Sequence, residues 1–371
     1  MSPRKQLAFA AYGDPFDPVI WSGTPVNLAS ALQKLDVEII GLNCDPLTSK
    51  WKWDLIRRTG KWLGGHEVNY IRRGLGRKKC AELAATLPAE CVGVMHMSSL
   101  TVPKAGSTPG VRHFLLCDSM DNYWRTFAPD DQATPRQKRE SERHEREAVA
   151  ATELFFPISE HAAANLRDYY GVKADKITVV GTGRGQIEPL RGTKDYSRKN
   201  ILMVAKLRFE DKGGPLLLEA LQIARKTDPQ LHLTLVSPDE FRPFVQGMEG
   251  VTITGRVEWS ELQRLFDEAC LYAMPALCEP WGLVYAEALA TKTPILGLNR
   301  AALPELTNNG EYGILVDEAT PQAVAAALLE AVSNPQKLQQ MGEAGQKYCL
   351  DAFSWDRTAA RVFHRLFESN A

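Results

Sequence analysis

The sequence predicts two doubly wound α/β domains, each built on a parallel sheet with helices on both faces. Short apolar runs alternate with amphipathic segments along nearly the whole chain. Runs that are apolar without polar alternation are typical of parallel strands buried on both faces. The chain has 371 residues, which at about 150 residues per domain favours two domains. Ligands bind beyond the carboxyl ends of such strands, so we expect the two domains to face each other across a cleft.

The expected elements follow this rhythm in order. In the first half, apolar runs predict strands at 6–11, 37–42, 67–71, 91–97, 111–117, 153–158 and 177–181, and amphipathic spacing predicts helices at 24–35, 136–151 and 160–170. In the second half, the same criteria predict strands at 200–205, 231–236, 251–254, 271–275, 294–298 and 313–316, and helices at 213–227, 258–269, 282–291, 320–332 and 335–350.

Two features set the expected domain boundaries. The stretch 183–199 is polar, carries Gly and Pro and lacks apolar periodicity, as is typical of a linker. A last helix is expected over 354–369, where Ser354 can cap apolar residues spaced three and four apart. No strand follows it, so it must pack on a domain already formed. We therefore expect an N-terminal domain at 1–185, a C-terminal domain at 186–353, and a helix at 354–371 packed back on the N-terminal domain.

Composition and charge exclude several classes of protein. Hydrophobic residues make up 44% and charged residues 24%, which is typical of a globular chain and excludes a disordered one. Lys and Arg number 44 against 45 Asp and Glu, so no nucleic-acid partner is expected. No stretch approaches the roughly 18 apolar residues of a membrane span, and the first apolar run is short for a signal peptide. We expect a cytoplasmic enzyme.

The cysteines predict neither disulfides nor a metal site. There are seven, an odd number, and none forms a Cys-x-x-Cys pair or a Cys/His cluster with zinc-ligand spacing. Most lie in apolar runs, where a buried reduced thiol is expected.

The segment 274–290, MPALCEPWGLVYAEALA, holds the most specific pattern. A strand is expected to end near its start, and a helix to begin at Gly282. The free N–H groups of Gly282, Leu283 and Val284 at the positive end of that helix would suit a diphosphate. Glu279 precedes this anion site and could reach an attached sugar. Glu287 lies roughly 8 Å further along the helix axis, where it could accept hydrogen bonds from a ribose.

The string E-P-x-G-L-V-x-x-E-A in this segment resembles the signature of retaining nucleotide-sugar glycosyltransferases with the GT-B fold, specifically glycosyltransferase family 4. The resemblance extends over 204–221, 253–269 and 302–316, and in the first half it is best at 145–181. It implies two Rossmann-like domains and a donor site in the second.

The resemblance implies roles for several residues. Glu279 would contact donor-sugar hydroxyls and Glu287 the ribose, while Lys206 and Lys212 would hold the diphosphate. Lys206 stands where the family has Arg, and Lys cannot make the bidentate fork of Arg. Arg208, two residues on, could supply that fork instead.

Further binding residues follow other expected strands. The backbone near Val257 would read the nucleobase, and Arg256 could stack on it. Gly23 stands in the place of a glycine-rich loop that approaches the diphosphate and the reacting sugar. Asp118 is a candidate for binding acceptor hydroxyls or for capping a helix. Cys117 stands where many family members have His, which removes any role of that His.

The segment 50–80 is strongly basic. It carries ten Lys or Arg against two acidic residues, with Trp51, Trp53 and Trp62 interleaved. This pattern suits peripheral contact with an anionic membrane, at the inner face, or with an anionic acceptor. A solvated helix face gives the same pattern, so both interpretations stay open.

The expected reaction is transfer of a hexose from a nucleotide diphosphate sugar to a hydroxyl acceptor, in glycan, glycolipid or polysaccharide synthesis. No Asp-x-Asp sequence is present to hold a metal, so we expect metal-independent chemistry without a cofactor, in which cations and helix N–H groups stabilise the leaving diphosphate. The resemblance implies retention of configuration. A non-catalytic sugar-nucleotide sensor, or an epimerase or phosphorylase with the same fold, are the alternatives.

Overall fold

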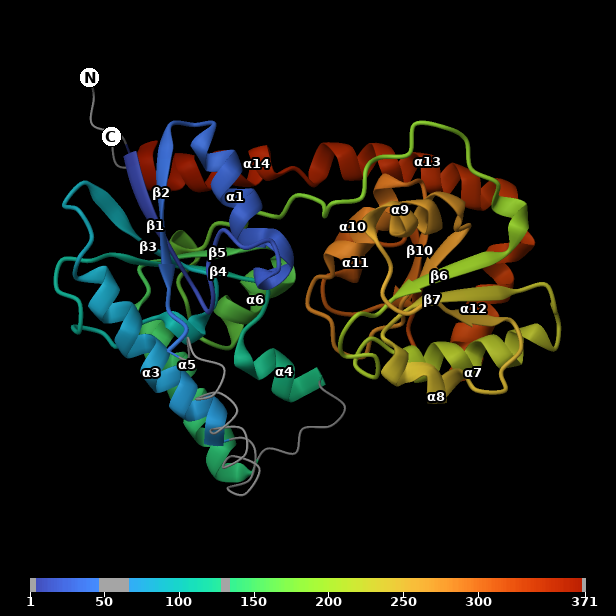
Figure 1. The fold of residues 1–371 in the computed structure, drawn as a ribbon, viewed down its shortest axis with the longest axis horizontal. Helices are drawn as coiled ribbons and strands as arrows, with labels where there is room; N and C mark the ends of the chain where they lie inside the picture. The colour runs from blue at the N-terminus through green and yellow to red at the C-terminus, as the bar shows by residue number, and fades with distance from the viewer. Residues whose placement is uncertain (1–4, 47–66, 128–133, 369–371) are drawn as a thin grey trace. The chain divides into compact units, whose positions relative to one another are not determined.

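A computed structural model describes residues 5–46, 67–127 and 134–368. It divides into two compact units. Unit 1 comprises residues 1–126, 130–183 and 355–371, and unit 2 comprises residues 127–129 and 184–354. Each is a doubly wound α/β unit (Figure 1).

Unit 1 is built on a five-stranded parallel sheet with the order β2-β1-β3-β4-β5. Its strands are β1 (Lys5–Ala11), β2 (Val37–Asn43), β3 (Cys91–His96), β4 (His113–Cys117) and β5 (Leu154–Pro157). Its helices are α1 (Thr24–Gln33), α3 (Glu67–Ala84), α4 (Asp121–Phe127), α5 (Pro135–Ala151), α6 (Glu160–Asp168) and α14 (Trp355–Phe363). Short 3-10 turns are η1 (Ile20–Gly23), η2 (Ser99–Thr101) and η3 (Ala174–Lys176), and η6 (His364–Glu368) is a π-helical segment that follows α14.

Two predicted strands of unit 1 are wrong. The segment 67–71 begins the helix α3, in which Arg77, Cys80 and Ala84 are buried at helical spacing. The prediction rested on a window of only five residues, whereas the longer window through Ala84 has the three-to-four spacing of a helix. The segment 177–181 forms only an isolated bridge, between Ile177 and Phe155. Two backbone hydrogen bonds join it to β5, so it follows that strand without becoming part of the sheet.

The last helix belongs to unit 1. Lys34, next to α1, pairs with Asp356 of α14 at 2.7 Å. The Arg361 guanidinium donates to the carbonyl oxygens of Val179 and Val180 at 3.4 and 3.3 Å. The chain therefore returns to unit 1 after completing unit 2.

Unit 2 is built on a six-stranded parallel sheet with the order β11-β10-β9-β6-β7-β8. Its strands are β6 (Asn200–Val204), β7 (His232–Val236), β8 (Val251–Ile253), β9 (Leu271–Ala273), β10 (Ile295–Leu298) and β11 (Gly313–Val316). Its helices are α7 (Gly214–Arg225), α8 (Arg242–Val245), α9 (Trp259–Glu268), α10 (Leu283–Ala290), α11 (Leu303–Leu306), α12 (Pro321–Ser333) and α13 (Pro335–Ala352), with turns η4 (Tyr196–Arg198) and η5 (Asp239–Phe241).

The strand order of unit 2 reverses between β6 and β9. From β6 the chain adds β7 and β8 on one side, and then crosses to place β9, β10 and β11 on the other. At such a switch point the two following loops diverge to opposite faces of the sheet and leave a crevice for a ligand. The loops after β6 and β9 are therefore where a site is expected.

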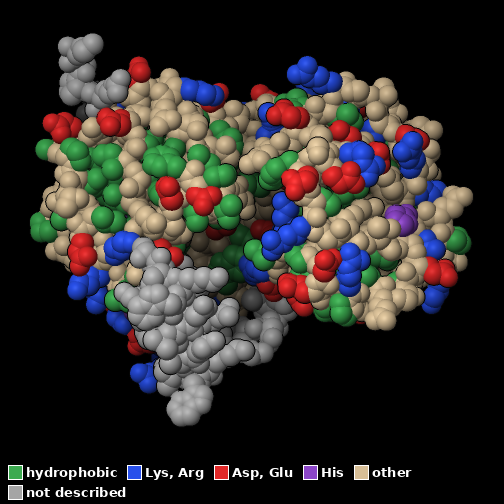
Figure 2. All heavy atoms as spheres, in the orientation of Figure 1, with side chains coloured by type: hydrophobic (Ala, Val, Ile, Leu, Met, Phe, Trp, Pro, Cys, Tyr) green, Lys and Arg blue, Asp and Glu red, His purple; other side chains and the backbone are tan. Residues whose placement is uncertain are grey.

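Charges of both signs are interspersed over the surface seen in Figure 2, in keeping with the near-zero net charge. Among the described residues, no helix is both long enough and apolar enough to cross a membrane. Six of the seven cysteines are buried as free thiols, and Cys91 is half-buried.

Candidate functional site

The loops after β6 and β9 are joined to each other at the switch point of unit 2. The carbonyl oxygen of Asp211 accepts hydrogen bonds from the N–H groups of Leu277 and Cys278, at 2.8 and 2.9 Å. Gly213 comes so close to the second loop that a Cβ atom there would lie 2.0 Å from the carbonyl oxygen of Pro275. Its φ of +75° also favours glycine. Residues far apart in the sequence thus share one rigid junction.

Lys212 and Glu279, one from each loop, form an ion pair at this junction. The Nζ atom lies 3.4 Å from Oε2, and the two side chains are 19% and 18% exposed. A pair so little exposed is screened less by water than a surface pair. Both charges remain accessible enough to contact a bound molecule.

Lys206, the other predicted diphosphate ligand, packs on an aromatic ring. Its Nζ atom lies 4.5 Å from the centroid of the Trp259 ring at the start of α9. Trp259 is 48% exposed. The ring face attracts the ammonium group and restricts its position. Sequence analysis missed Trp259, although an aromatic residue two positions after Val257 was a usable signal.

Glu287 lies inside the unit beneath these cations. It is 9% exposed, and its Oε1 atom accepts a hydrogen bond from the N–H group of Gln186 at 3.1 Å. Burial raises the pKa of Glu287 to about 7, although the Gln186 hydrogen bond and the charges of Lys206 and Lys212 act to lower it. The two lysines therefore act on this carboxyl group, and all four predicted residues form one electrostatic cluster.

The segment before β6 is shaped to receive Glu287. A Cβ atom at Gly185 would lie 1.9 Å from Oε1 of Glu287, so only glycine leaves room for the carboxyl group. Sequence analysis assigned this stretch to a linker and missed its contact with the site, because nothing in a polar Gly-containing run distinguishes the two.

Arg208 has an ion-pair partner within its own loop. Its φ is +58°, and its guanidinium pairs with the carboxylate of Asp211 at 2.6 Å. Arg208 also acts on Cys278, next to Glu279 in the other loop: burial raises the pKa of the Cys278 thiol to about 11, and the charge and hydrogen bond of Arg208 act to lower it. Its role at the diphosphate stays a prediction.

The start of α10 supplies backbone donors beside the pair of loops. Gly282 precedes the helix with φ +79°, and a Cβ atom there would lie 2.8 Å from the ring of Tyr285. Leu283 and Val284 follow in the first turn and are half-buried. First-turn N–H groups have no partner within their own helix, and they lie at its positive end.

The predicted base-reading residues follow β8. Gly255 is buried with φ +73°, Val257 is half-buried, and the Arg256 side chain is exposed. They immediately precede Trp259, so the same loop leads directly to the aromatic ring that contacts Lys206.

In unit 1, Gly23 completes a strained turn at the start of α1. Trp21, Ser22 and Gly23 all have left-handed backbone conformations, with φ of 44°, 53° and 78°. Such conformations cost non-glycine residues about 1–2 kcal/mol each. Runs of strained residues concentrate at ligand sites, which agrees with the predicted role of this loop.

Asp118 is half-buried just after β4, where its Oδ1 atom accepts a hydrogen bond from the Ser119 hydroxyl at 3.0 Å. The neighbouring Cys117 is buried, and burial together with the Asp118 charge raises the pKa of its thiol. This chain thus has an un-ionised thiol at the position of the family histidine.

Two further observations concern possible metal ligands and the basic segment. Among the described residues, no group of three or more His, Cys, Asp or Glu side chains could hold a metal ion. Residues 50–66 of the basic segment lie outside the described part of the chain.

The chain is similar to one known family and to several known proteins. Residues 198–334 match the model of the family Glycosyl transferases group 1. A D-inositol 3-phosphate glycosyltransferase of Segniliparus rotundus is 27% identical over 256 residues, which cover 63% of this chain and 56% of the relative. An MMP alpha-(1->4)-mannosyltransferase of Mycolicibacterium hassiacum is 28% identical over 214 residues, covering 55% and 51%. The chain thus matches little more than half the length of these curated relatives.

Solved structures match over the whole chain. The sucrose-phosphate synthase of Thermosynechococcus elongatus has a TM-score of 0.74 at 17% identity, covering 99% of this chain and 100% of that one. WaaG, a glycosyltransferase involved in lipopolysaccharide biosynthesis, has a TM-score of 0.70 at 16% identity, covering 98% and 100%. The Anabaena protein HepE, solved with UDP and glucose, has a TM-score of 0.67 at 13% identity, covering 99% and 100%. The predicted GT-B fold is confirmed, and residues 198–334 are similar to the family Glycosyl transferases group 1.

Proposed function

We propose that this chain, with its group 1 domain in a GT-B fold, is a retaining glycosyltransferase of family 4. It moves a hexose from a nucleotide diphosphate sugar to a hydroxyl acceptor in the synthesis of a glycan, glycolipid or cell-surface polysaccharide. One observation supports this most strongly. Lys206, Lys212, Glu279 and Glu287 converge at the switch point between β6 and β9, beside the start of α10.

In this proposal the donor diphosphate binds between the two lysines and the first turn of α10. Negative charge grows on the diphosphate as the sugar–phosphate bond breaks. Lys206, Lys212 and the N–H groups of Gly282, Leu283 and Val284 stabilise that charge in the transition state. Because these groups are held in place before the donor binds, little reorganisation accompanies the reaction.

The glutamates orient the donor. Glu279, held by Lys212, accepts hydrogen bonds from sugar hydroxyls and fixes the ring relative to the departing phosphate. Glu287 accepts from the ribose hydroxyls, and Gly255, Arg256 and Val257 border the nucleobase. In unit 1, Gly23 contributes backbone donors near the reacting sugar, and Asp118 binds an acceptor hydroxyl.

The acceptor hydroxyl attacks the sugar on the face from which the diphosphate leaves, which accounts for retention without a covalent intermediate. The leaving diphosphate can take the proton from the attacking hydroxyl. Lys206 and Lys212 perform the charge stabilisation, so no divalent ion is required. We further propose that the segment 50–80 makes peripheral contact with a membrane. The protein would then lie in the cytoplasm, at the inner membrane face.

The test is donor turnover across a panel of UDP- and GDP-sugars. We expect release of the nucleoside diphosphate with one of them, undiminished by EDTA, and loss of release in Glu279→Gln. NMR of the product gives its anomeric configuration, which should be that of the donor. A protein that binds a donor but neither transfers nor hydrolyses its sugar would be a sensor and would refute the proposal. A requirement for Mg²⁺ or Mn²⁺ would refute metal independence alone.

A further inference from the structure

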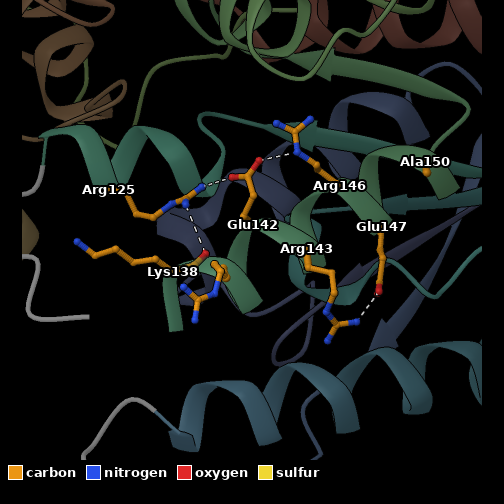
Figure 3. A pocket seen from close by; sticks show the side chains of 8 residues that line it. Arg125, Lys138, Glu142, Arg143, Arg146, Glu147 and Ala150 are labelled. Carbon is orange, nitrogen blue, oxygen red and sulfur yellow. Dashed lines mark hydrogen bonds and ion pairs between the residues drawn. The ribbon is translucent and has the colours of Figure 1, made fainter. Parts of the chain in front are cut away.

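A pocket of about 650 Å³ on unit 1 is lined by charged side chains of α4 and α5 (Figure 3). Three of its guanidinium groups are paired with carboxylates within the unit. Arg125 pairs with Asp121 and Glu142, Arg143 with Glu140 and Glu147, and Arg146 with Glu142. The charges around this pocket are therefore largely balanced, whereas in unit 2 a carboxyl group lies against the loop that we propose for the nucleobase.

That carboxyl group belongs to Asp239, in the loop after β7, and it lies against Gly255, in the loop after β8. A Cβ atom on Gly255 would lie 3.1 Å from Oδ1 of Asp239, and the carboxyl carbon and Oδ2 are at 3.8 and 3.9 Å from the same position. Gly255 is buried and has a φ of +73°. The two loops thus meet at a bare stretch of backbone with a carboxylate beside it.

Hydrogen bonds fix the loop of Asp239 to the donor side of unit 2. The hydroxyl group of the buried Ser237 donates to the carbonyl oxygen of Ala205 at 2.8 Å. Ala205 immediately precedes Lys206, which we propose for the diphosphate. Asp239 begins the turn η5, where its Oδ1 atom accepts from the Nε atom of Arg242 at 2.8 Å. Both the loop and its carboxyl group are therefore held in place.

The loop after β8 leads from this carboxyl group to the proposed diphosphate site. Gly255 lies against Asp239, Val257 follows, and Trp259 contacts Lys206 at 4.5 Å. A nucleotide with its diphosphate at Lys206 therefore has its base toward the Gly255 end of the loop. The Asp239 side chain is 72% exposed, so the edge of a base can reach it.

A carboxylate distinguishes the nucleobases by their hydrogen-bond donors. It only accepts, through about four lone pairs, so the bond from Arg242 leaves acceptor sites for a ligand. Guanine presents two adjacent donors, N1–H and the 2-amino group, which match the two oxygens of one carboxylate as a guanidinium group does. Uracil presents one N–H between two carbonyl oxygens, and adenine and cytosine present a ring-nitrogen acceptor beside the amino group. A carboxylate repels these acceptors, and such repulsion gives selectivity.

We propose that Asp239 makes this site selective for guanine, so that the donor is a GDP-sugar. The inference rests on the proposed function and specifies the class of its donor. Asp239 accepts from N1–H and from the 2-amino group. Arg256, exposed and next to Gly255, has the donors that O6 and N7 of guanine commonly bind. A uracil base loses the pair of hydrogen bonds and brings carbonyl oxygens to the carboxylate.

Calorimetry with GDP, IDP and UDP tests the inference, because IDP differs from GDP only in lacking the 2-amino group. We expect GDP to bind about tenfold more tightly than either of the others. The variant Asp239→Asn keeps the size of the side chain but replaces one acceptor with a donor. It should lose about tenfold in affinity for GDP and change little in affinity for UDP. The control Glu240→Gln makes the same change at the adjacent exposed carboxyl group and should bind GDP like the unaltered protein.

The outcomes separate this inference from the proposed function. Tighter binding of UDP than of GDP, equal affinities for GDP and IDP, or equal effects of the two substitutions would overturn the assignment of guanine. Turnover of UDP- and GDP-sugars is measured in parallel. If a UDP-sugar is turned over, the proposed function survives and only the choice of base is rejected. If no nucleotide binds and no sugar nucleotide is turned over, both fail.

Discussion

The Nζ atom of Lys212 lies 3.4 Å from Oε2 of Glu279, and this contact joins the two loops that diverge from the switch point of unit 2. The cation that we propose for the diphosphate and the carboxylate that we propose for the sugar are thus held together. Because the pair is mostly shielded from water, each charge also fixes the other. The two residues should therefore act as one functional unit.

A double-mutant cycle tests this coupling. We expect Lys212→Met to lower kcat/KM for the sugar nucleotide by about 100-fold. The substitution removes an ammonium group that would stabilise the negative charge developing on the diphosphate. Glu279→Gln should have an effect of similar order. The double variant should lose less than the product of the two, because residues in contact are not additive. Strictly multiplicative losses would contradict the coupling.

The Trp259 ring that contacts Lys206 should position the ammonium group for donor binding. Trp259→Ala removes the contact at 4.5 Å, which is worth about 0.5–1 kcal/mol at an exposed site. We expect donor KM to rise by about two- to fivefold with a smaller change in kcat. Trp259→Phe keeps an aromatic face and should recover most of the affinity. Equal effects of Ala and Phe would contradict a role of the aromatic face in holding Lys206.

The buried Glu287 predicts a pH dependence. Its pKa is about 7 in the folded protein and near 4.3 in the unfolded chain, so the folded state binds more protons between these values. The group's contribution to stability is therefore fully present below the unfolded pKa and is lost as pH rises through about 7. Donor affinity should change in the opposite direction, because only the ionised carboxylate accepts from both ribose hydroxyls.

Glu287→Gln separates these two effects. The free energy of unfolding of the variant minus that of the unaltered protein should rise by up to about 3 kcal/mol from pH 5 to pH 8.5. Urea denaturation at each pH measures this difference. Its donor KM should rise at pH 8 and lose its dependence on pH near 7. A donor KM of the variant equal to that of the unaltered protein at every pH would exclude contact with the ribose.

Gly213 predicts a strong steric effect. A methyl group would approach the carbonyl oxygen of Pro275 to 2.0 Å, and the positive φ disfavours alanine as well. We expect Gly213→Ala to destabilise the protein by about 2 kcal/mol or more and to weaken donor binding. Gly192→Ala is the matched control, since nothing lies within 4 Å of its Cβ position. A thermal melt in which both variants match the unaltered protein would contradict this account of the loop junction.

Sequence reasoning succeeded where a pattern was long and local. The strand–loop–helix segment 274–290 was assigned correctly because β9, the loop and α10 are consecutive. Doubly wound folding then brings Lys206 and Lys212 to the same edge, so the convergence with Glu279 followed from topology.

Sequence reasoning failed where the outcome depended on contacts across the fold. Glycine is required at position 185 because a Cβ atom there would collide with the carboxyl group of Glu287, which comes from a distant part of the sequence. The segment 67–71 was too short a window to distinguish a strand from the first turns of α3.

Binding of UDP and GDP by calorimetry tests the central claim most directly. The unaltered protein should bind one of the two, and Lys206→Met/Lys212→Met should lose at least about 100-fold in affinity, because two cations next to the diphosphate are removed. The control Lys226→Met, an exposed lysine at the end of α7, should bind like the unaltered protein. Nucleotide binding of undiminished strength in the double variant would contradict the placement of the diphosphate at the switch point of unit 2.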